Sequence, residues 1–243
     1  ADAGGNINAF TAEDMTVYHQ RLPSSKVELA FKLEAERMHL LKLNQEVLNT
    51  EREVVKEEYR VNYENNPTNK AFMKVQELLY PDTSYNWGPI GTLEDLNKMT
   101  VSDCLAYYTS YYAPNNAVLV VAGDVQPENV LVLAQKYFGA IPQKTVLPSP
   151  ALAMPEQAAI RKFTITCGMP LPVALIAYRI PEARHPDIIP LQVLSDILSS
   201  GDSSRLYKAL VREQELAQSV SGWPEILQGP GYFMYSAEHL PEI

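Results

Sequence analysis

The 243-residue sequence predicts an α+β fold in which largely antiparallel sheets pack against helices in two homologous layered domains. Runs of β-branched and aromatic residues have the length of strands, and longer amphipathic stretches carry helix caps. Neither half alternates strand and helix strictly, as a parallel sheet would require. Prolines cluster in and just before residues 145–158, which predicts a linker between a first domain at 1–144 and a second at 159–243.

Composition excludes several classes of function. The chain has 20 Lys and Arg against 29 Asp and Glu, a net charge of −9, and no basic run that could bind a phosphate backbone, so we expect no nucleic-acid partner. The longest uncharged stretch, residues 104–123, contains Pro114 and predicts helix, turn and strand, not a membrane span. The two cysteines, Cys104 and Cys167, allow at most one disulfide.

The first domain is predicted to begin with extended strands over residues 6–18, with a bend near residues 11–14. Ser24 and Ser25 supply the cap of a helix that runs to about residue 42, with a buried stripe that includes Phe31. Further helices are expected at 45–64, 70–79, 100–112 and 127–137, and a buried strand at 116–122.

The second domain repeats strand, helix and strand, although no repeat period is visible. Strands are predicted at 160–167, 173–180, 219–223 and 231–237, and helices at 186–198 and from Asp202 onward. Gly201-Asp202-Ser203 superficially resembles a serine nucleophile motif, but Asp202 and Ser203 are better explained as a helix cap.

Two glutamates on the predicted helix at 45–64 are the candidates for chemistry. Glu51 and Glu58 continue the spacing of the apolar stripe that includes Val47 and Val54, and they lie on one helical face about 10.5 Å apart along the axis. Carboxylates on a core-facing stripe need a cation or strong donors. One interpretation pairs them with Arg37, Arg52 or Arg60. The other makes one a metal ligand and the other its supporting carboxylate.

No other catalytic motif is present. The histidines His19, His39, His185 and His239 are scattered, and neither H-x-x-E-H nor H-E-x-x-H occurs, so the residues alone assemble no zinc site. The chain also lacks a G-x-S-x-G elbow, a Walker-type loop and G-x-G-x-x-G.

Taken as a whole, the chain resembles the pitrilysin/insulinase family of zinc peptidases, which includes the mitochondrial processing peptidase. The resemblance covers nearly all residues, in several motifs that occur in the family's order. They are GGNINAFT at 4–11, ERM at 36–38, EREVVKEE at 51–58, YYAPNNAV at 111–118, AGDV at 122–125, YFGAIP at 137–142, HPD at 185–187 and GDSSRLY at 201–207. One departure is PDTSY at 81–85, where the family commonly has His-Pro-Tyr and only the Tyr is in register.

The resemblance implies an inverted zincin. In this family an H-x-x-E-H helix supplies two histidine ligands and the glutamate that activates water, and a later glutamate is the third ligand. By resemblance Glu58 is that third zinc ligand and Glu51 the carboxylate that supports the site. The family holds its peptide or unfolded-protein substrate as an added strand on the edge that here carries Asn8, Ala9 and Phe10.

The same resemblance makes the chain incomplete. The family's histidines lie about 75–80 residues before the third ligand, upstream of Ala1, and its second domain usually continues beyond Ile243. We therefore expect a chain trimmed at both ends, inactive as given, and dependent on a homologous partner subunit or homodimer. A periplasmic or other non-cytosolic bacterial compartment is a hypothesis. The alternatives are a non-catalytic structural or partner subunit of the family, or a plain binding module with Glu51 and Glu58 in salt bridges.

Overall fold

The computed structural model describes residues 3–148, 152, 154–166, 168–169 and 171–239. The chain forms two compact units. The first unit comprises residues 1–11, 15–57 and 92–150, and the second comprises 12–14, 58–91 and 151–243. Both combine antiparallel strands with helices, which confirms the predicted α+β class. The domain boundaries predicted from the sequence stay a prediction.

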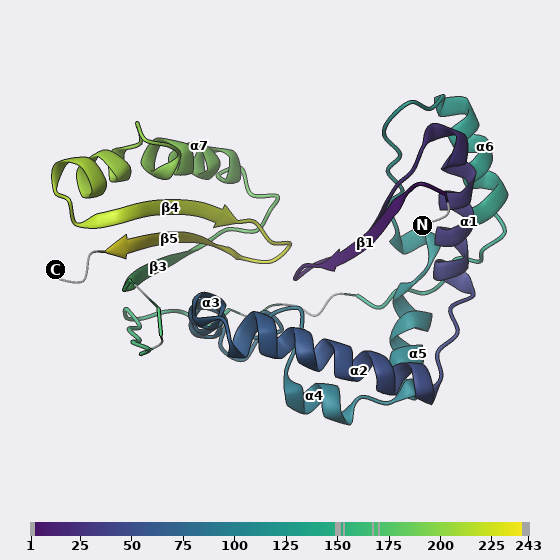
Figure 1. Ribbon diagram of the computed structural model, residues 1–243, viewed down its shortest axis with the longest axis horizontal. Coiled ribbons are helices and arrows are strands. Elements are labelled where there is room, and N and C mark those ends of the chain that lie inside the picture. Colours follow the sequence, from purple (N-terminus) through teal and green to yellow (C-terminus); the bar gives the residue numbers. More distant parts are fainter. Residues whose placement is uncertain (1–2, 149–151, 153, 167, 170, 240–243) are drawn as a thin grey trace. The chain divides into compact units, whose positions relative to one another are not determined.

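The first unit contains one antiparallel strand pair and several helices (Figure 1). Strand β1 (Asn6–Thr11) pairs with β2 (Thr16–Arg21), so that Ala9 lies opposite Tyr18. The helices are α1 (Val27–His39), α2 (Gln45–Tyr59), α4 (Leu93–Lys98), α5 (Val101–Tyr111) and α6 (Pro127–Phe138). The strands and the helices α1, α2, α5 and α6 were predicted within a few residues, whereas α4 was missed.

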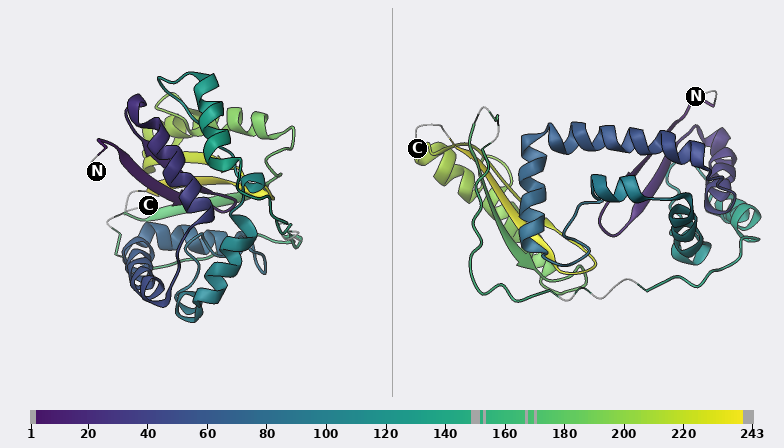
Figure 2. Two further views of the ribbon diagram at one scale, coloured as in Figure 1. Left: turned by 90° about the vertical axis from the view of Figure 1, so that its right-hand side faces the viewer. Right: turned by 90° about the horizontal axis from the view of Figure 1, so that it is seen from below.

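The core of the first unit is small. Helices α1 and α6 lie side by side (Figure 2), with Phe31 buried and its ring 6.2 Å from that of Phe138. The buried Tyr108 of α5 donates to the carbonyl of Arg37 at the end of α1. A capping box starts α5, because the Thr100 side chain accepts from the Asp103 amide and the Asp103 side chain accepts from the Thr100 amide. The predicted start of this helix is thereby confirmed.

The second unit is built on a three-stranded antiparallel sheet in the order β3–β5–β4. The strands are β3 (Val173–Ile180), β4 (Ala217–Glu225) and β5 (Gly231–His239), and they confirm three predicted strands. Helix α7 (Ile188–Ser199) covers one face of β4, where Ser195 and Ser199 both donate to the Gly222 carbonyl (Figure 1). A Cβ on Gly222 would lie 2.7 Å from the Ser199 hydroxyl, so this close approach requires glycine.

Helix α3 (Pro67–Leu79) and the following loop pack against β3 and β5. Asn66 caps α3 and Pro67 occupies its first turn, so the helix starts before the predicted residue 70. The core on this side consists of Leu79, Tyr80, Tyr85 and Leu227. Irregular helical turns at Arg60–Glu64 and Tyr207–Glu213 complete the described elements, with two short 3-10 turns at Ser24–Lys26 and Pro114–Asn116 in the first unit.

Two predicted strands are wrong. Residues 117–122 and 160–166 form no strand, and Cys167, the last residue of the second prediction, lies outside the described residues. Val118 is 90% exposed and Ile160 83% exposed. Strand propensity measures how well side chains fit a half-buried sheet, but the backbone also needs a neighbouring strand for its hydrogen bonds. No strand within the described ranges pairs with either segment.

Cys104 is a free thiol, and Cys167 lies outside the described residues. None of the helices in the described part of the chain combines the length and the apolar character that crossing a bilayer demands.

Candidate functional site

Helix α2 carries both candidate glutamates, but neither faces a core. Glu51 and Glu58 are exposed, and α2 buries none of its residues. The expectation that they lie on a core-facing stripe is therefore wrong. Val47 and Val54 of the same stripe are themselves exposed, because burial requires a second element packed on that face.

The arginines considered as partners are used elsewhere. Arg37 pairs with Glu34 at 3.0 Å. Arg52 donates to the carbonyls of Leu96 and Met99, which ties α2 to α4 in the first unit. Within the described residues, Glu51 and Glu58 form no ion pair or hydrogen bond. Both carboxylates are thus available to a partner that the described chain does not supply.

A complete metal site is absent from the described residues, where no three His, Cys, Asp or Glu side chains come together closely enough to hold an ion. His19 lies on β2, and the centroid of its ring is 6.3 Å from that of Phe10. Glu58 therefore supplies a single carboxylate ligand, and one ligand does not form a zinc site.

Strand β1, which carries Asn8, Ala9 and Phe10, has an open edge. Its sheet contains only β1 and β2 among the described strands, and every residue of β1 is exposed. The amide of Ala9 donates to the Asn8 side-chain oxygen at 2.9 Å, a bond made within β1 itself. Such an edge is chemically able to accept a further strand.

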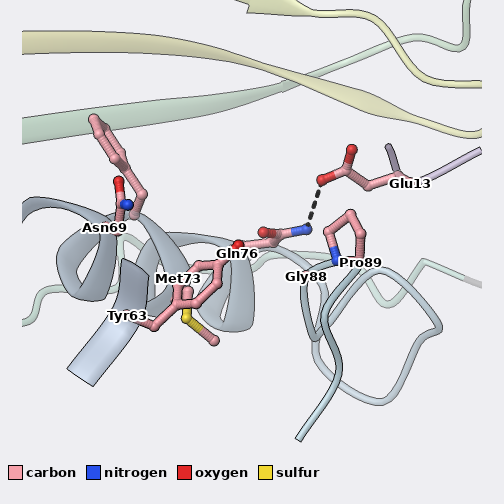
Figure 3. Close-up of a pocket in the computed structure, with 8 residues that line it drawn as sticks. Glu13, Tyr63, Asn69, Met73, Gln76, Gly88 and Pro89 are labelled. Atoms are coloured by element: carbon pink, nitrogen blue, oxygen red, sulfur yellow. Dashed lines mark hydrogen bonds between the residues drawn. The ribbon is translucent and has the colours of Figure 1, made fainter. Parts of the chain in front are cut away.

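The second unit contains an acidic cavity that sequence reasoning missed (Figure 3). Its volume is about 210 Å³. The lining residues are Glu13, Tyr63, Asn69, Phe72, Met73, Gln76, Gly88 and Pro89. Glu13 comes from the bend between β1 and β2, and the other residues come from α3 and its two flanking segments. Only their tertiary arrangement brings them together, and no local motif could have indicated it.

Beside this cavity, Asp14 fixes the neighbouring loops of the second unit. Its carboxylate accepts from the Tyr85 hydroxyl at 2.6 Å and from the Gln228 amide at 2.7 Å. The Tyr85 hydroxyl in turn accepts from the Gly229 amide. Burial, together with the hydrogen bond to Asp14, raises the pKa of Tyr85 to about 12, so this phenol stays a donor at neutral pH.

Comparison with known proteins gives consistent matches over the whole chain. A sequence profile described as "Insulinase (Peptidase family M16)" matches residues 1–89, and one described as "Peptidase M16 inactive domain" matches residues 98–242. The zinc protease PqqE of Helicobacter pylori is 30% identical over 99% of this chain and 55% of its own length. The crystal structure of a protease from Helicobacter pylori superimposes with a TM-score of 0.93 at 30% identity, over 100% of this chain and 59% of that one.

Another relative is named as a subunit of a complex and not as a protease. Subunit 1 of the mitochondrial cytochrome b-c1 complex of Bos taurus is 26% identical over 82% of this chain and 42% of its own length. The chain spans about half the length of the curated relatives it matches.

Proposed function

Because the chain belongs to the insulinase family of M16 peptidases, we propose that it is part of a zinc metalloendopeptidase that hydrolyses peptides held as an added β-strand. The observation that carries this proposal is the exposed, open edge of β1 at Asn8, Ala9 and Phe10. Main-chain pairing at such an edge gives affinity with little demand on the peptide sequence. Extended segments of peptides and unfolded proteins are then the substrate class.

In substrate binding, each of the residues Asn8, Ala9 and Phe10 would have a separate role. In this binding mode the Ala9 N–H would face the open edge, where an added strand would replace the Asn8 side chain as acceptor. Asn8 would meanwhile hold the amide in place in the free protein. Phe10, half exposed and packed against His19, offers an apolar surface for a substrate side chain. An added strand would thus exchange a local hydrogen bond for a ladder of backbone bonds.

Replacing Ala9 by proline tests strand addition directly. In the proposed binding mode Ala9 directs its N–H to the open edge, so proline removes one donor there and should leave the pairing with β2 intact. We expect the affinity for a fluorescein-labelled, Val- and Thr-rich peptide to fall roughly tenfold, since one backbone hydrogen bond contributes about 0.5–1.5 kcal/mol. Fluorescence anisotropy on the 243-residue chain gives the dissociation constants.

The matched control is Ala9→Ser, which retains the amide and should bind the peptide as tightly as the parent chain. A second control methylates alternate backbone nitrogens of the peptide, which should weaken binding to the parent chain and have less effect on the proline variant. Equal peptide affinity of the proline variant and the parent chain contradicts strand addition at β1.

For zinc, we propose that Glu58 is one ligand and that Glu51 supports the site. Both carboxylates are exposed and without a partner among the described residues, which keeps them available. The residues present do not complete a zinc site, as no group of three ligating side chains forms in the described chain. The two histidines and the general-base glutamate would therefore have to come from polypeptide outside the printed sequence.

The incomplete set of zinc ligands predicts how much zinc this chain retains. We expect well below one equivalent of zinc per chain after dialysis, and no peptide hydrolysis, because one carboxylate cannot hold the ion that four-coordinate sites bind with three or more protein ligands. Atomic absorption together with a fluorogenic peptide assay measures both. Stoichiometric, tightly held zinc would show that this chain forms a site of its own.

A second candidate function is a non-catalytic structural or partner subunit. The match to a cytochrome b-c1 subunit favours it, because that relative is named as a component of a larger complex. The encoded sequence upstream of Ala1 separates the two candidates. An H-x-x-E-H segment about 75–80 residues before Glu58 supports the peptidase, and its absence supports the subunit. Association with a homologous subunit or a second copy, and a non-cytosolic bacterial compartment, stay proposals under either function.

A further inference from the structure

We propose that the acidic cavity beside α3 binds a single organic cation, the guanidinium or ammonium group of a peptide side chain. That the cation belongs to a peptide rests on the proposed function, whereas the cation site itself stands on the cavity alone. The whole cavity lies within the second unit (Figure 3).

The first argument is that the Glu13 carboxylate has no cationic partner among the residues that line the cavity. Glu13 is half-buried, and its one hydrogen bond within the described chain is the donation from Gln76 Nε2 at 3.2 Å. An ionised carboxylate accepts about four hydrogen bonds, so Glu13 retains most of its capacity. No Lys, Arg or His lines the cavity. Its negative charge is therefore not neutralised by the residues that surround it.

The effect of this charge is visible on neighbouring groups. Burial, and then the charge of Glu13, raise the pKa of Glu225 on β4. Burial and the charge of Glu13 are also the two largest causes of the raised pKa of Tyr63, which lines the cavity. Each shift disfavours a second negative charge, as expected where the local potential is negative. A bound cation would relieve this potential.

The second argument is the apolar lining. Tyr63 and Phe72 line the cavity with aromatic rings of the kind that attract cations, and Met73 and Pro89 provide surface for an aliphatic stem. Both rings are held in place by neighbours, since Tyr63 lies 5.6 Å from Tyr59 and Phe72 meets Trp223 edge-on at 5.9 Å. A carboxylate combined with fixed aromatic rings suits guanidinium and ammonium groups.

Size restricts the ligand further. The volume of about 210 Å³ is below the roughly 300–1,000 Å³ of pockets for drug-sized molecules, and it suits one side chain. A metal ion is disfavoured because no group of three ligating side chains forms among the described residues. Gly88 leaves space in the wall, since a Cβ built on it would meet nothing within 4 Å.

The test is a titration of the 243-residue chain with N-acetyl-arginine amide, followed by calorimetry at neutral pH. N-acetyl-lysine amide is the ammonium counterpart, and N-acetyl-citrulline amide is the uncharged analogue. We expect both cations to bind and citrulline to bind at least tenfold more weakly. The Glu13→Gln variant, which preserves the shape of the side chain but removes its charge, should bind N-acetyl-arginine amide at least tenfold more weakly.

Glu156→Gln is the matched control, because Glu156 is an exposed carboxylate of the same unit outside the cavity and its loss should leave affinity unchanged. Gly88→Leu should also reduce binding, by filling space. Tryptophan fluorescence melts confirm that each variant is folded. Equal affinity for arginine and citrulline compounds, or unchanged affinity in Glu13→Gln, overturns the proposal.

The outcome is independent of peptide hydrolysis, since the assay uses neither zinc nor strand addition. Ala9→Pro should retain affinity for N-acetyl-arginine amide while losing affinity for the extended peptide. Loss of both ligands in that variant would instead indicate a common disruption, and would contradict a cation site that stands alone.

Discussion

Replacing Glu58 by glutamine is expected to lower both zinc content and peptide hydrolysis at least about 100-fold, in a form of the protein that carries an H-x-x-E-H segment. Glutamine keeps the size of the side chain but removes the charged donor that the proposed site requires. Changes to groups that only support a metal ligand already cost about 10–100-fold, and loss of a ligand itself should exceed that range. Zinc content and turnover are measured on the same preparation.

Two further variants separate a ligand from a supporting carboxylate. Glu51→Gln should reduce zinc affinity by about 10–100-fold. Glu46→Gln removes another exposed carboxylate of α2 and should change neither quantity. Equal losses for Glu46 and Glu58 would show a general effect of charge on this helix, and full zinc occupancy in Glu58→Gln would remove Glu58 from the site.

Replacing Tyr80 by alanine is expected to destabilise the second unit by about 3–5 kcal/mol, as for other large aromatic residues removed from a core. Tyr80 is 0% exposed, and its ring meets Tyr85 and Tyr232 edge-on. Its hydroxyl donates to the Pro230 carbonyl at 2.8 Å. The substitution therefore opens a cavity and removes the donor to the partly buried Pro230 carbonyl.

Urea denaturation followed by tryptophan fluorescence measures this effect, because both tryptophans, Trp87 and Trp223, lie in the second unit. Tyr80→Phe keeps the ring and should cost about 1–3 kcal/mol, the penalty of the unpaired carbonyl. Tyr178→Ala, at a position that is 59% exposed, is the control and should cost less than about 1 kcal/mol. A similar loss for Tyr80→Ala and Tyr178→Ala would contradict the role assigned to Tyr80.

Local sequence signals predicted most elements because their causes are local. The Thr100 cap starts α5, and the nearly continuous apolar run at 173–180 forms β3. The sequence placed the start of the third helix at residue 70, whereas α3 begins at Pro67, which occupies its first turn. Several motifs in the family's order, spread over nearly the whole chain, indicated the family, which the profile matches then confirmed.

The candidate site was predicted less completely. Glu58 as a zinc ligand and Asn8–Phe10 as a substrate-binding strand stay predictions, and the sequence placed Glu51 and Glu58 on a buried face, whereas they are exposed. It also gave no sign of the cavity at Glu13, whose wall comes from segments more than 40 residues apart.

The sequence by itself determined the fold class, most helices and strands, and the family, because caps, periodicity and motifs act over a few neighbouring residues. Tertiary structure alone decided which faces are covered, whether residues 117–122 find a strand partner, and that Glu13 lines one cavity with Tyr63 and Phe72. Burial and charge pairing depend on groups that are distant in the chain, and their free energy exists only once those groups are placed together.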